Sequence, residues 1–328
     1  MSVLVDDPST GTSVTVRWEV WRDGQLHDIY DVVTGSWTIR WDRQADIPRI
    51  VDGLTVLSDV DFDRDRVRPV WCEGPHETPL GLFLWASGEQ VNGRLEDGVL
   101  YDRTLELRTP LSSTFGASGS AKAAMAELTA RAGVEVTLPE ADADLSPLAW
   151  PAGVRINRVI RQLADKAGWV VHFDRHGELV VRRAKVPGLD PPDVIYSAGD
   201  GNMVVHDSFR SGTSRTRRTN VWRVLSVSPT AAPTVAEWRL PADSPGSVAQ
   251  TGVEVVELIE ESGLDQQSAE LRAREAARQD RASGTSATME TVPTPDHDGN
   301  MLVEVDGKAW REDAWRLSRT QMQHDLSS

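Results

Sequence analysis

The histidines of this chain are the first residues to examine for metal or acid–base chemistry. His172 and His176 have the HxxxH spacing that can bind zinc when both lie on a helix. Their segment is instead predicted to be a strand and a turn, where the two rings need not converge, and the glutamate of the zinc-protease motif is missing. The remaining histidines are scattered along the sequence: His27, His76, His206, His297 and His324. The sequence therefore predicts no metal site and no catalytic triad.

Acidic residues at alternate positions form a second candidate site. Asp61, Asp63 and Asp65 resemble the start of a calcium-binding loop. The match fails because Arg66 stands where the loop needs glycine and Cys72 stands where it needs glutamate. We interpret these acids as side chains on the solvent face of a strand.

Nucleophilic and glycosidic sites are not indicated by any local pattern. The segment GASGS at 116–120 has serine where the nucleophile elbow needs its second glycine. Asp142 and Asp144 are predicted to lie in a solvated acidic loop. A carboxylate pair for glycoside hydrolysis remains open, because the chain has 50 acidic residues and nothing singles out two of them. We therefore assign no catalytic, cofactor-binding or metal-binding residue and expect no enzyme activity.

Twelve tryptophans are an unusual number for a chain of 328 residues. One interpretation is a sugar-stacking platform. We favour strand cores and subunit contacts, because six of them lie in alternating strands, where a wide ring fills a sandwich interior. These six are Trp18, Trp37, Trp41, Trp222, Trp238 and Trp315. An exposed tryptophan beside two carboxylates would instead favour a glycan-binding or glycan-cleaving protein.

Charge and composition limit the possible partners. The net charge of −15 repels phosphate backbones and disfavours ordinary nucleic-acid binding. The basic run at 210–218 could contact phosphate, but a solvated loop or a subunit contact is the simpler interpretation. The single cysteine excludes an intramolecular disulfide. The sequence has no apolar run of about 20 residues and no signal-peptide pattern, so we expect synthesis in a cytoplasm and no membrane insertion.

The elements that would position any site are mostly strands. Residues 12–110 alternate apolar and polar side chains, and we expect a first barrel-like or sandwich-like domain over 1–115. Tight turns are predicted at Asp23-Gly24, Asp52-Gly53, Asn92-Gly93 and Asp97-Gly98, pairs suited to positive φ angles.

A small α/β domain is expected over 116–188. Its helices are predicted over about 120–132, capped by Ser120, and about 154–167, ended by Gly168. A hairpin over 169–184 follows, with its turn at 174–177.

The rest of the chain returns to strands. A second barrel-like domain is expected over 189–290, interrupted by a helix at about 265–282 that we place on a surface or at a subunit contact. A terminal β region over 291–328 completes the chain. The predicted fold class is β-rich α+β and multidomain, with two β-barrel or sandwich domains and a small α/β insertion.

Several segments in this order resemble the hub proteins of bacteriophage tail tips and baseplates, in particular minor tail proteins of long-tailed phages of actinobacteria. They cover about residues 35–320 and include GSWTIRWDRQADIPRIVDGLTVL, RVRPVWCEG, TPLGLFLWASGEQ, NRVIRQLADKAGWVVHFDRHGELVVRR, RRTNVWRVLSV, AELRAREAARQDRA and VPTPDHDGNMLVEVDG.

The resemblance implies a homotrimer with a central channel, in which two tail-tube-like barrels per chain let a threefold tip dock on a sixfold tube. It implies partners: a distal tail protein or tail tube above, tip, spike or fibre proteins, a tape measure protein, and DNA that passes without specific binding. The location would be the virion tail tip, after assembly in the host cytoplasm. Many relatives continue into a spike, fibre or hydrolase, so we expect host binding and cell-wall cleavage to belong to other proteins.

Two alternatives remain open at this point. One is the glycan-binding or glycan-cleaving tail component, and the other is the hub of a contractile injection system.

Overall fold

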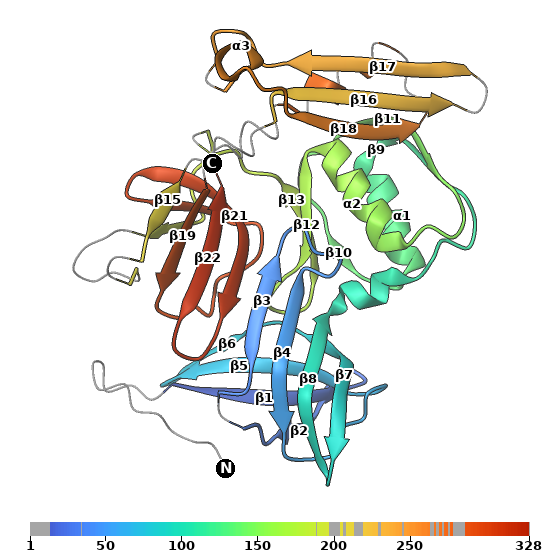
Figure 1. Cartoon of the computed structure of the whole chain (residues 1–328). Coiled ribbons are helices and arrows are strands. Elements are labelled where there is room, and N and C mark those ends of the chain that lie inside the picture. Colours follow the sequence, from blue (N-terminus) through green and yellow to red (C-terminus); the bar gives the residue numbers. More distant parts are fainter. Residues whose placement is uncertain are drawn as a thin grey trace. The chain divides into compact units, whose positions relative to one another are not determined.

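The computed structural model describes residues 14–327 except 34, 188, 197–203, 206–207, 213–218, 229–230, 245, 263–265, 267–268, 271, 275 and 278–285. The chain forms two compact units (Figure 1). The first unit is Met1–His206 with Met289–His324, and the second is Asp207–Thr288 with Asp325–Ser328. Most of the basic run at 210–218 lies outside the described residues.

The first unit begins with eight strands. They are β1 Val14–Arg22, β2 Gln25–Tyr30, β3 Thr38–Asp42, β4 Arg49–Val56, β5 Arg66–Glu73, β6 His76–Pro79, β7 Phe83–Val91 and β8 Arg94–Asp102. Seven are hydrogen-bonded in the order β3-β4-β8-β7-β5-β1-β2, and β6 pairs with β5. Trp18 on β1 and Trp37 just before β3 are buried in the core of this sheet, where their rings meet edge to face at 5.6 Å.

Two of the four predicted turns join strands as expected. Asp23 and Gly24 have φ angles of 49° and 76° between β1 and β2, and Asn92 and Gly93 make the same turn between β7 and β8.

The other two predicted turns are wrong. Asp52-Gly53 lies inside β4 and Asp97-Gly98 lies inside β8, and the pairing of these strands shifts register between Val51 and Leu54. The positive φ angles at Gly53 and Asp97 therefore belong to bulges, which bend the two paired strands, and not to turns that reverse the chain. A dipeptide alone does not distinguish the two, because both need the same backbone angles.

The interpretation of the Asp61–Asp65 segment is also corrected. Residues 62–64 form a turn rather than a strand, and Asp65 is buried. Its carboxylate accepts 2.5 Å hydrogen bonds from Arg22 Nε and from the hydroxyl of Tyr30. These partners lie far away in sequence, so local alternation could not reveal them.

The α/β part of the first unit follows β8. It consists of η1 Arg103–Arg108, β9 Phe115–Ser120, α1 Ala121–Arg131, β10 Val136–Thr137, β11 Asp144–Trp150, α2 Ile156–Ala167, β12 Trp169–Phe173 and β13 Leu179–Arg183. Gly168 ends α2 at φ 71°, and Ser120 caps α1 by accepting from Ala123 N. The apolar faces of both helices share one core with β12 and β13.

The last strands of the first unit extend the N-terminal sheet. They are β14 Val194–Tyr196, β19 Ser286–Thr291, β20 Leu302–Val305, β21 Lys308–Leu317 and β22 Met322–Ser327, with β19 and β22 crossing the limit between the units. β21 pairs antiparallel with β3, and β14 pairs in parallel with β20. We expected β14 in a separate domain over 189–290, but its partner β20 belongs to the expected terminal region.

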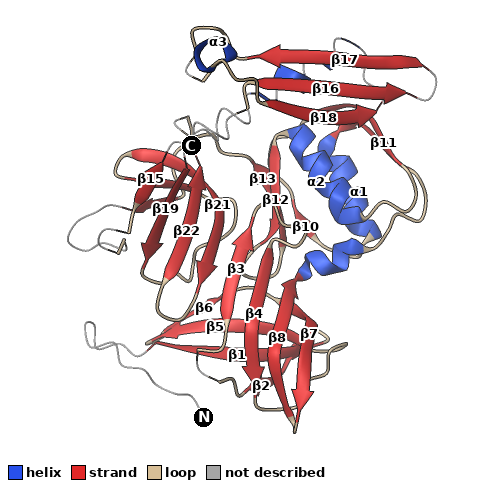
Figure 2. Ribbon diagram, in the orientation of Figure 1, coloured by secondary structure: helices blue, strands red, loops and turns tan. Residues whose placement is uncertain are grey.

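The second unit contains β15 Arg210–Gly212, β16 Val221–Ser228, β17 Ala231–Arg239, α3 Val248–Thr251 and β18 Val256–Ser262. β16 is the central strand between β17 and β18, and Figure 2 shows these three strands in red as one layer. β15 pairs antiparallel with the start of β19.

A helix covers part of this three-stranded sheet. Described residues between 266 and 277 are helical, whereas Leu271 and the ends of the expected helix at about 265–282 lie outside the described residues. Ala269, Ala273, Ala276 and Ala277 are buried against β16. Alanine permits this close approach of a helix to a sheet without a large apolar side chain. The fold class is confirmed, because the chain is β-rich, has several sheets and includes a small α/β part.

Candidate functional site

A fully buried cluster of His297, Glu312 and His324 lies in the first unit. Both oxygens of Glu312 are 2.8 Å from His297 Nε2, and Oε1 is also 2.8 Å from His324 Nδ1. The three side chains have 0% exposure. Their facing donor atoms all lie within 4.8 Å of one another.

Strand alternation positions two of these three side chains. On β22, His324 is buried between Met322 and Leu326 on the inward face. On β21, Glu312 takes an inward position two residues after buried Trp310. His297 comes from the segment between β19 and β20. A charged residue at an inward strand position is the sequence signal that could have indicated this site.

In each imidazole, the nitrogen that points away from Glu312, called the outer nitrogen, lies within hydrogen-bond distance of a hydroxyl group. The hydroxyl of Tyr196 lies 3.3 Å from His297 Nδ1, and Thr291 Oγ1 lies 3.0 Å from His324 Nε2. With neutral rings, each inner N–H donates to Glu312 and each outer nitrogen accepts from a hydroxyl. Every polar atom of the three side chains therefore has a partner.

Burial controls the charges in this cluster. Burial raises the pKa of Glu312 to about 7. The hydrogen bond from His324 acts in the opposite direction, but its effect is smaller than that of burial. Burial lowers the pKa of His297 to about 4, and it also lowers the pKa of His324. Both imidazoles are consequently neutral near pH 7.

A second buried polar group adjoins the first. Arg49 on β4 is ion-paired with Asp298, and His172 Nε2 lies 3.6 Å from the other carboxylate oxygen. Trp315 separates the groups: its ring contacts that of His297 edge to face, and the guanidinium of Arg49 lies 5.5 Å from its centroid. The pKa of Asp298 stays below its usual range, because the charge of Arg49 and the nearby imidazole of His172 outweigh the effect of burial.

The histidine pair chosen from sequence spacing does not converge. His172 is buried on β12, whereas His176 lies in the turn that follows, where Asp174 Oδ1 accepts its backbone N–H. The structure instead brings together His297 and His324, which the sequence analysis left unassigned.

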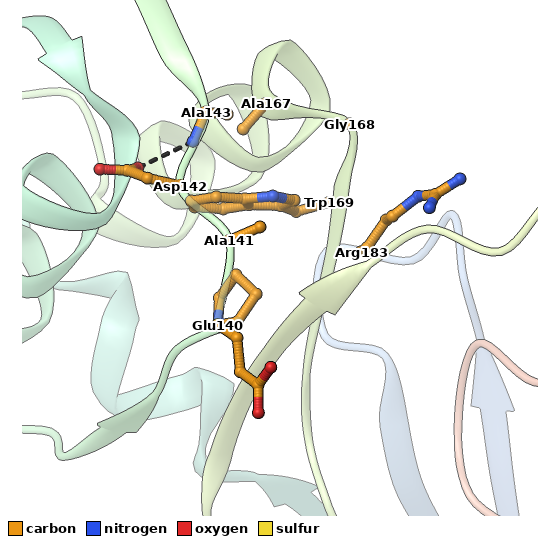
Figure 3. A pocket seen from close by; sticks show the side chains of 9 residues that line it. Glu140, Ala141, Asp142, Ala143, Ala167, Gly168, Trp169 and Arg183 are labelled. Carbon is orange, nitrogen blue, oxygen red and sulfur yellow. Dashed lines mark hydrogen bonds between the residues drawn. The ribbon is translucent and has the colours of Figure 1, made fainter.

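A shallow pocket in the α/β part tests the glycan alternative (Figure 3). It is lined by Pro139, Glu140, Ala141, Asp142, Ala143, Ala167, Gly168, Trp169 and Arg183. Figure 3 shows the Trp169 ring flanked by Ala141 and Ala167, with the side chains of Glu140 and Arg183 directed away from it.

The pocket does not provide a sugar-stacking surface. Trp169 is only 6% exposed. The carboxylate of Asp142 already accepts hydrogen bonds from Ser120 Oγ and from the amides of Lys122 and Ala143. Ten of the twelve tryptophans are buried, and Trp21 and Trp238 are partly exposed. The tryptophans fill cores, as the alternating pattern predicted.

Comparisons with known proteins identify the fold. No family model matches the chain, and no curated protein matches it in sequence. The tail protein from Neisseria meningitidis MC58 superposes with a TM-score of 0.68 at 14% identity, over 95% of this chain and 96% of that one. This chain shares its fold with that tail protein.

Two further structures have the same fold. The 43 kDa tail protein of prophage MuSo2 from Shewanella oneidensis has a TM-score of 0.64 at 13% identity, over 96% of this chain and 98% of that one. An E. coli component of the type VI secretion system has a TM-score of 0.53 at 7% identity, over 94% of this chain and 76% of that one. No helix in the described ranges is long and apolar enough to cross a membrane.

Proposed function

We propose that this protein is a structural, non-enzymatic hub of a phage tail tip. The observation that carries the proposal is a tail-protein fold shared over 95% of this chain and 96% of its Neisseria counterpart. A match over the full length of both chains relates the whole architecture, not one common module. The sequence resemblance to minor tail proteins of long-tailed actinobacterial phages adds the tail tip as the location.

The proposed assembly is a homotrimer around a channel. Two β modules per chain would give six around a threefold axis, so that a threefold tip can dock on the sixfold tail tube or distal tail ring. Tip, spike or fibre proteins and the tape measure protein are the other proposed neighbours. Assembly would take place in the host cytoplasm, before the virion is released.

An edge strand supports a contact between subunits. β2 ends the strand order of its sheet, and two of its large apolar side chains face solvent, with Leu26 52% and Ile29 51% exposed. An open apolar edge invites pairing with another chain, and a closed ring covers such edges.

The acidity fits a conduit for DNA. Three chains of net charge −15 would carry −45 in total. A surface with few cations releases few DNA counterions, so DNA gains little by adsorbing during ejection. Replacing channel acids by lysine should slow ejection, and unchanged ejection from such particles would contradict this function for the charge.

The mass of the purified protein in solution tests the assembly. A chain of 36.1 kDa should give a species of three times that mass. Leu26→Asp combined with Ile29→Asp should shift it toward monomer, whereas Leu189→Asp, at a position 83% exposed, should not. Imaging of assembled particles should then place the trimer at the tail tip. A stable monomer that hydrolyses saccharides would overturn the proposal.

The hub of a contractile injection system is the second candidate. The type VI secretion component supports it, because its fold spans 94% of this chain at a TM-score of 0.53. Imaging separates the two candidates, since a contractile sheath around the tube is expected of the injection system and not of a long flexible tail.

A further inference from the structure

The His297–Glu312–His324 cluster has the donor chemistry of a transition-metal site. Two imidazole nitrogens and one carboxylate oxygen form a ligand set that zinc uses in proteins. The three donor atoms come from separate segments of the first unit and all lie within 4.8 Å of one another. Folding therefore gathers a ligand set that no local sequence spacing displays.

The surroundings of the cluster fit imidazoles that bind a metal. A metal-bound ring carries its proton on the outer nitrogen, which then needs an acceptor. Thr291 Oγ1 stands 3.0 Å from the outer nitrogen of His324, and the hydroxyl of Tyr196 stands 3.3 Å from that of His297. A hydroxyl can accept as well as donate, so both rings can change tautomer without losing a partner.

The spacing requires only a small adjustment. Zinc–ligand bonds of about 2.0–2.1 Å place two tetrahedral ligands roughly 3.3 Å apart. The nitrogen–oxygen distances in the cluster are 2.8 Å, so each ring would withdraw by about half an ångström. That movement is within the reach of small side-chain rotations.

Charge also favours a cation at this point. The ionised form of Glu312, which a metal would bind, would place one negative charge in an interior where all three side chains have 0% exposure. The nearby Arg49 is already paired with Asp298. A divalent ion would compensate the carboxylate directly.

We propose that His297, Glu312 and His324 bind a zinc ion in the core of the first unit. The three side chains leave the fourth position of a tetrahedral ion to a water molecule. The ion would join β21, β22 and the segment before β20, and so hold the terminal strands of the sheet together. This site is independent of the proposed tail-tip function, because it depends only on the fold of one chain.

The test begins with the full-length chain, purified without a histidine tag. Metal analysis should find one zinc per chain. After chelation, the thermal midpoint should fall, and added zinc should restore it. Cobalt(II) in place of zinc should give the visible absorption of a tetrahedral site, a readout that needs no variant.

Variants then locate the ion. His324→Gln and His297→Gln should lose the zinc and the chelator effect, and Thr291→Val should weaken zinc affinity about 10- to 100-fold. His172→Gln is the matched control, because this buried imidazole lies outside the donor set and should leave one zinc per chain. A chain that binds neither zinc nor cobalt, or a His324→Gln variant that keeps stoichiometric zinc, would overturn the proposal.

Discussion

The guanidinium of Arg49 is ion-paired with the carboxylate of Asp298, 249 residues further along the chain. Arg49 lies on β4, and its side chain is 2% exposed. The Nε2 atom of His172 on β12 lies 3.6 Å from the second carboxylate oxygen of Asp298. The pair therefore links the N-terminal sheet, the α/β hairpin and the segment that carries His297, all within the first unit.

Removing this buried cation should destabilise the first unit strongly. Arg49→Met leaves Asp298 without its main counter-charge, and we expect a loss of about 3–5 kcal/mol in the free energy of unfolding. Urea denaturation at one fixed protein concentration measures it. Arg40→Met is the matched control on the neighbouring strand, because the Arg40–Asp52 pair is exposed and should contribute about 0–1 kcal/mol. Equal losses from the two variants would refute a special role for the buried pair.

Gly98 lies where β8 passes too close to its neighbours for a side chain. A Cβ atom there would lie 2.8 Å from the carbonyl oxygen of Leu54 and 2.8 Å from the ring of Trp85. Gly98→Ala should therefore cost about 1–3 kcal/mol in the free energy of unfolding.

Gly116→Ala provides the control for this substitution. Its Cβ would meet nothing nearer than the carbonyl oxygen of Leu148 at 3.9 Å. We expect that variant to stay within about 1 kcal/mol of the wild type in the same urea denaturation. A well-tolerated Gly98→Ala would show that the bulge in β8 can relax.

Asp65 should make stability depend on pH in the acid range. Burial of its carboxyl opposes ionisation, but hydrogen bonds from Arg22 and Tyr30 outweigh burial and lower the pKa. Asp65→Asn should cost about 1.5–3 kcal/mol at neutral pH. Because the pKa is lower in the folded state, the full stabilisation is present at pH values above the unfolded-state pKa of about 3.9. It is lost as the pH falls through the folded-state pKa.

The difference in the free energy of unfolding between wild type and Asp65→Asn should accordingly stay constant from about pH 7 to 5 and shrink below about pH 4. Asp63→Asn, at an exposed position in the same turn, should change stability little at any pH. A difference that grows on acidification would contradict this assignment.

Ser120 should stabilise α1 and set the ionisation of Asp142. Its Oγ accepts the amide of Ala123 at 3.0 Å and donates to Asp142 at 2.5 Å. Ser120→Ala should cost about 1 kcal/mol, seen as faster amide hydrogen exchange in the first turn of α1. The hydrogen bond from Ser120 is the main cause that lowers the pKa of Asp142, so that pKa should rise in the variant when followed by NMR. Ser118→Ala, on the exposed side of β9, should change neither quantity.

Features that depend on a few neighbouring residues could be predicted from the sequence. The helix α2 and its end at Gly168 follow from apolar spacing and from one residue that adopts φ 71° easily. The hairpin β12–β13 follows from two β-branched runs around a turn. In both cases the local energetics already favour the observed structure.

Features that depend on distant partners could not be predicted in the same way. The pairs Asp52-Gly53 and Asp97-Gly98 favour positive φ wherever they occur, but the register between β4 and β8 decides that they form bulges. Asp65 looks like a surface acid until Arg22 and Tyr30 are folded onto it.

The sequence by itself determined the strand-rich composition, the α/β hairpin unit and the order of segments that resembles tail-tip hubs. Only the tertiary structure decided that β21 pairs with β3, that Arg49 meets Asp298, and that His297 and His324 meet on Glu312. The physical reason is that backbone preference and side-chain periodicity act over a few residues. Contacts between residues far apart in the chain depend on how whole sheets pack.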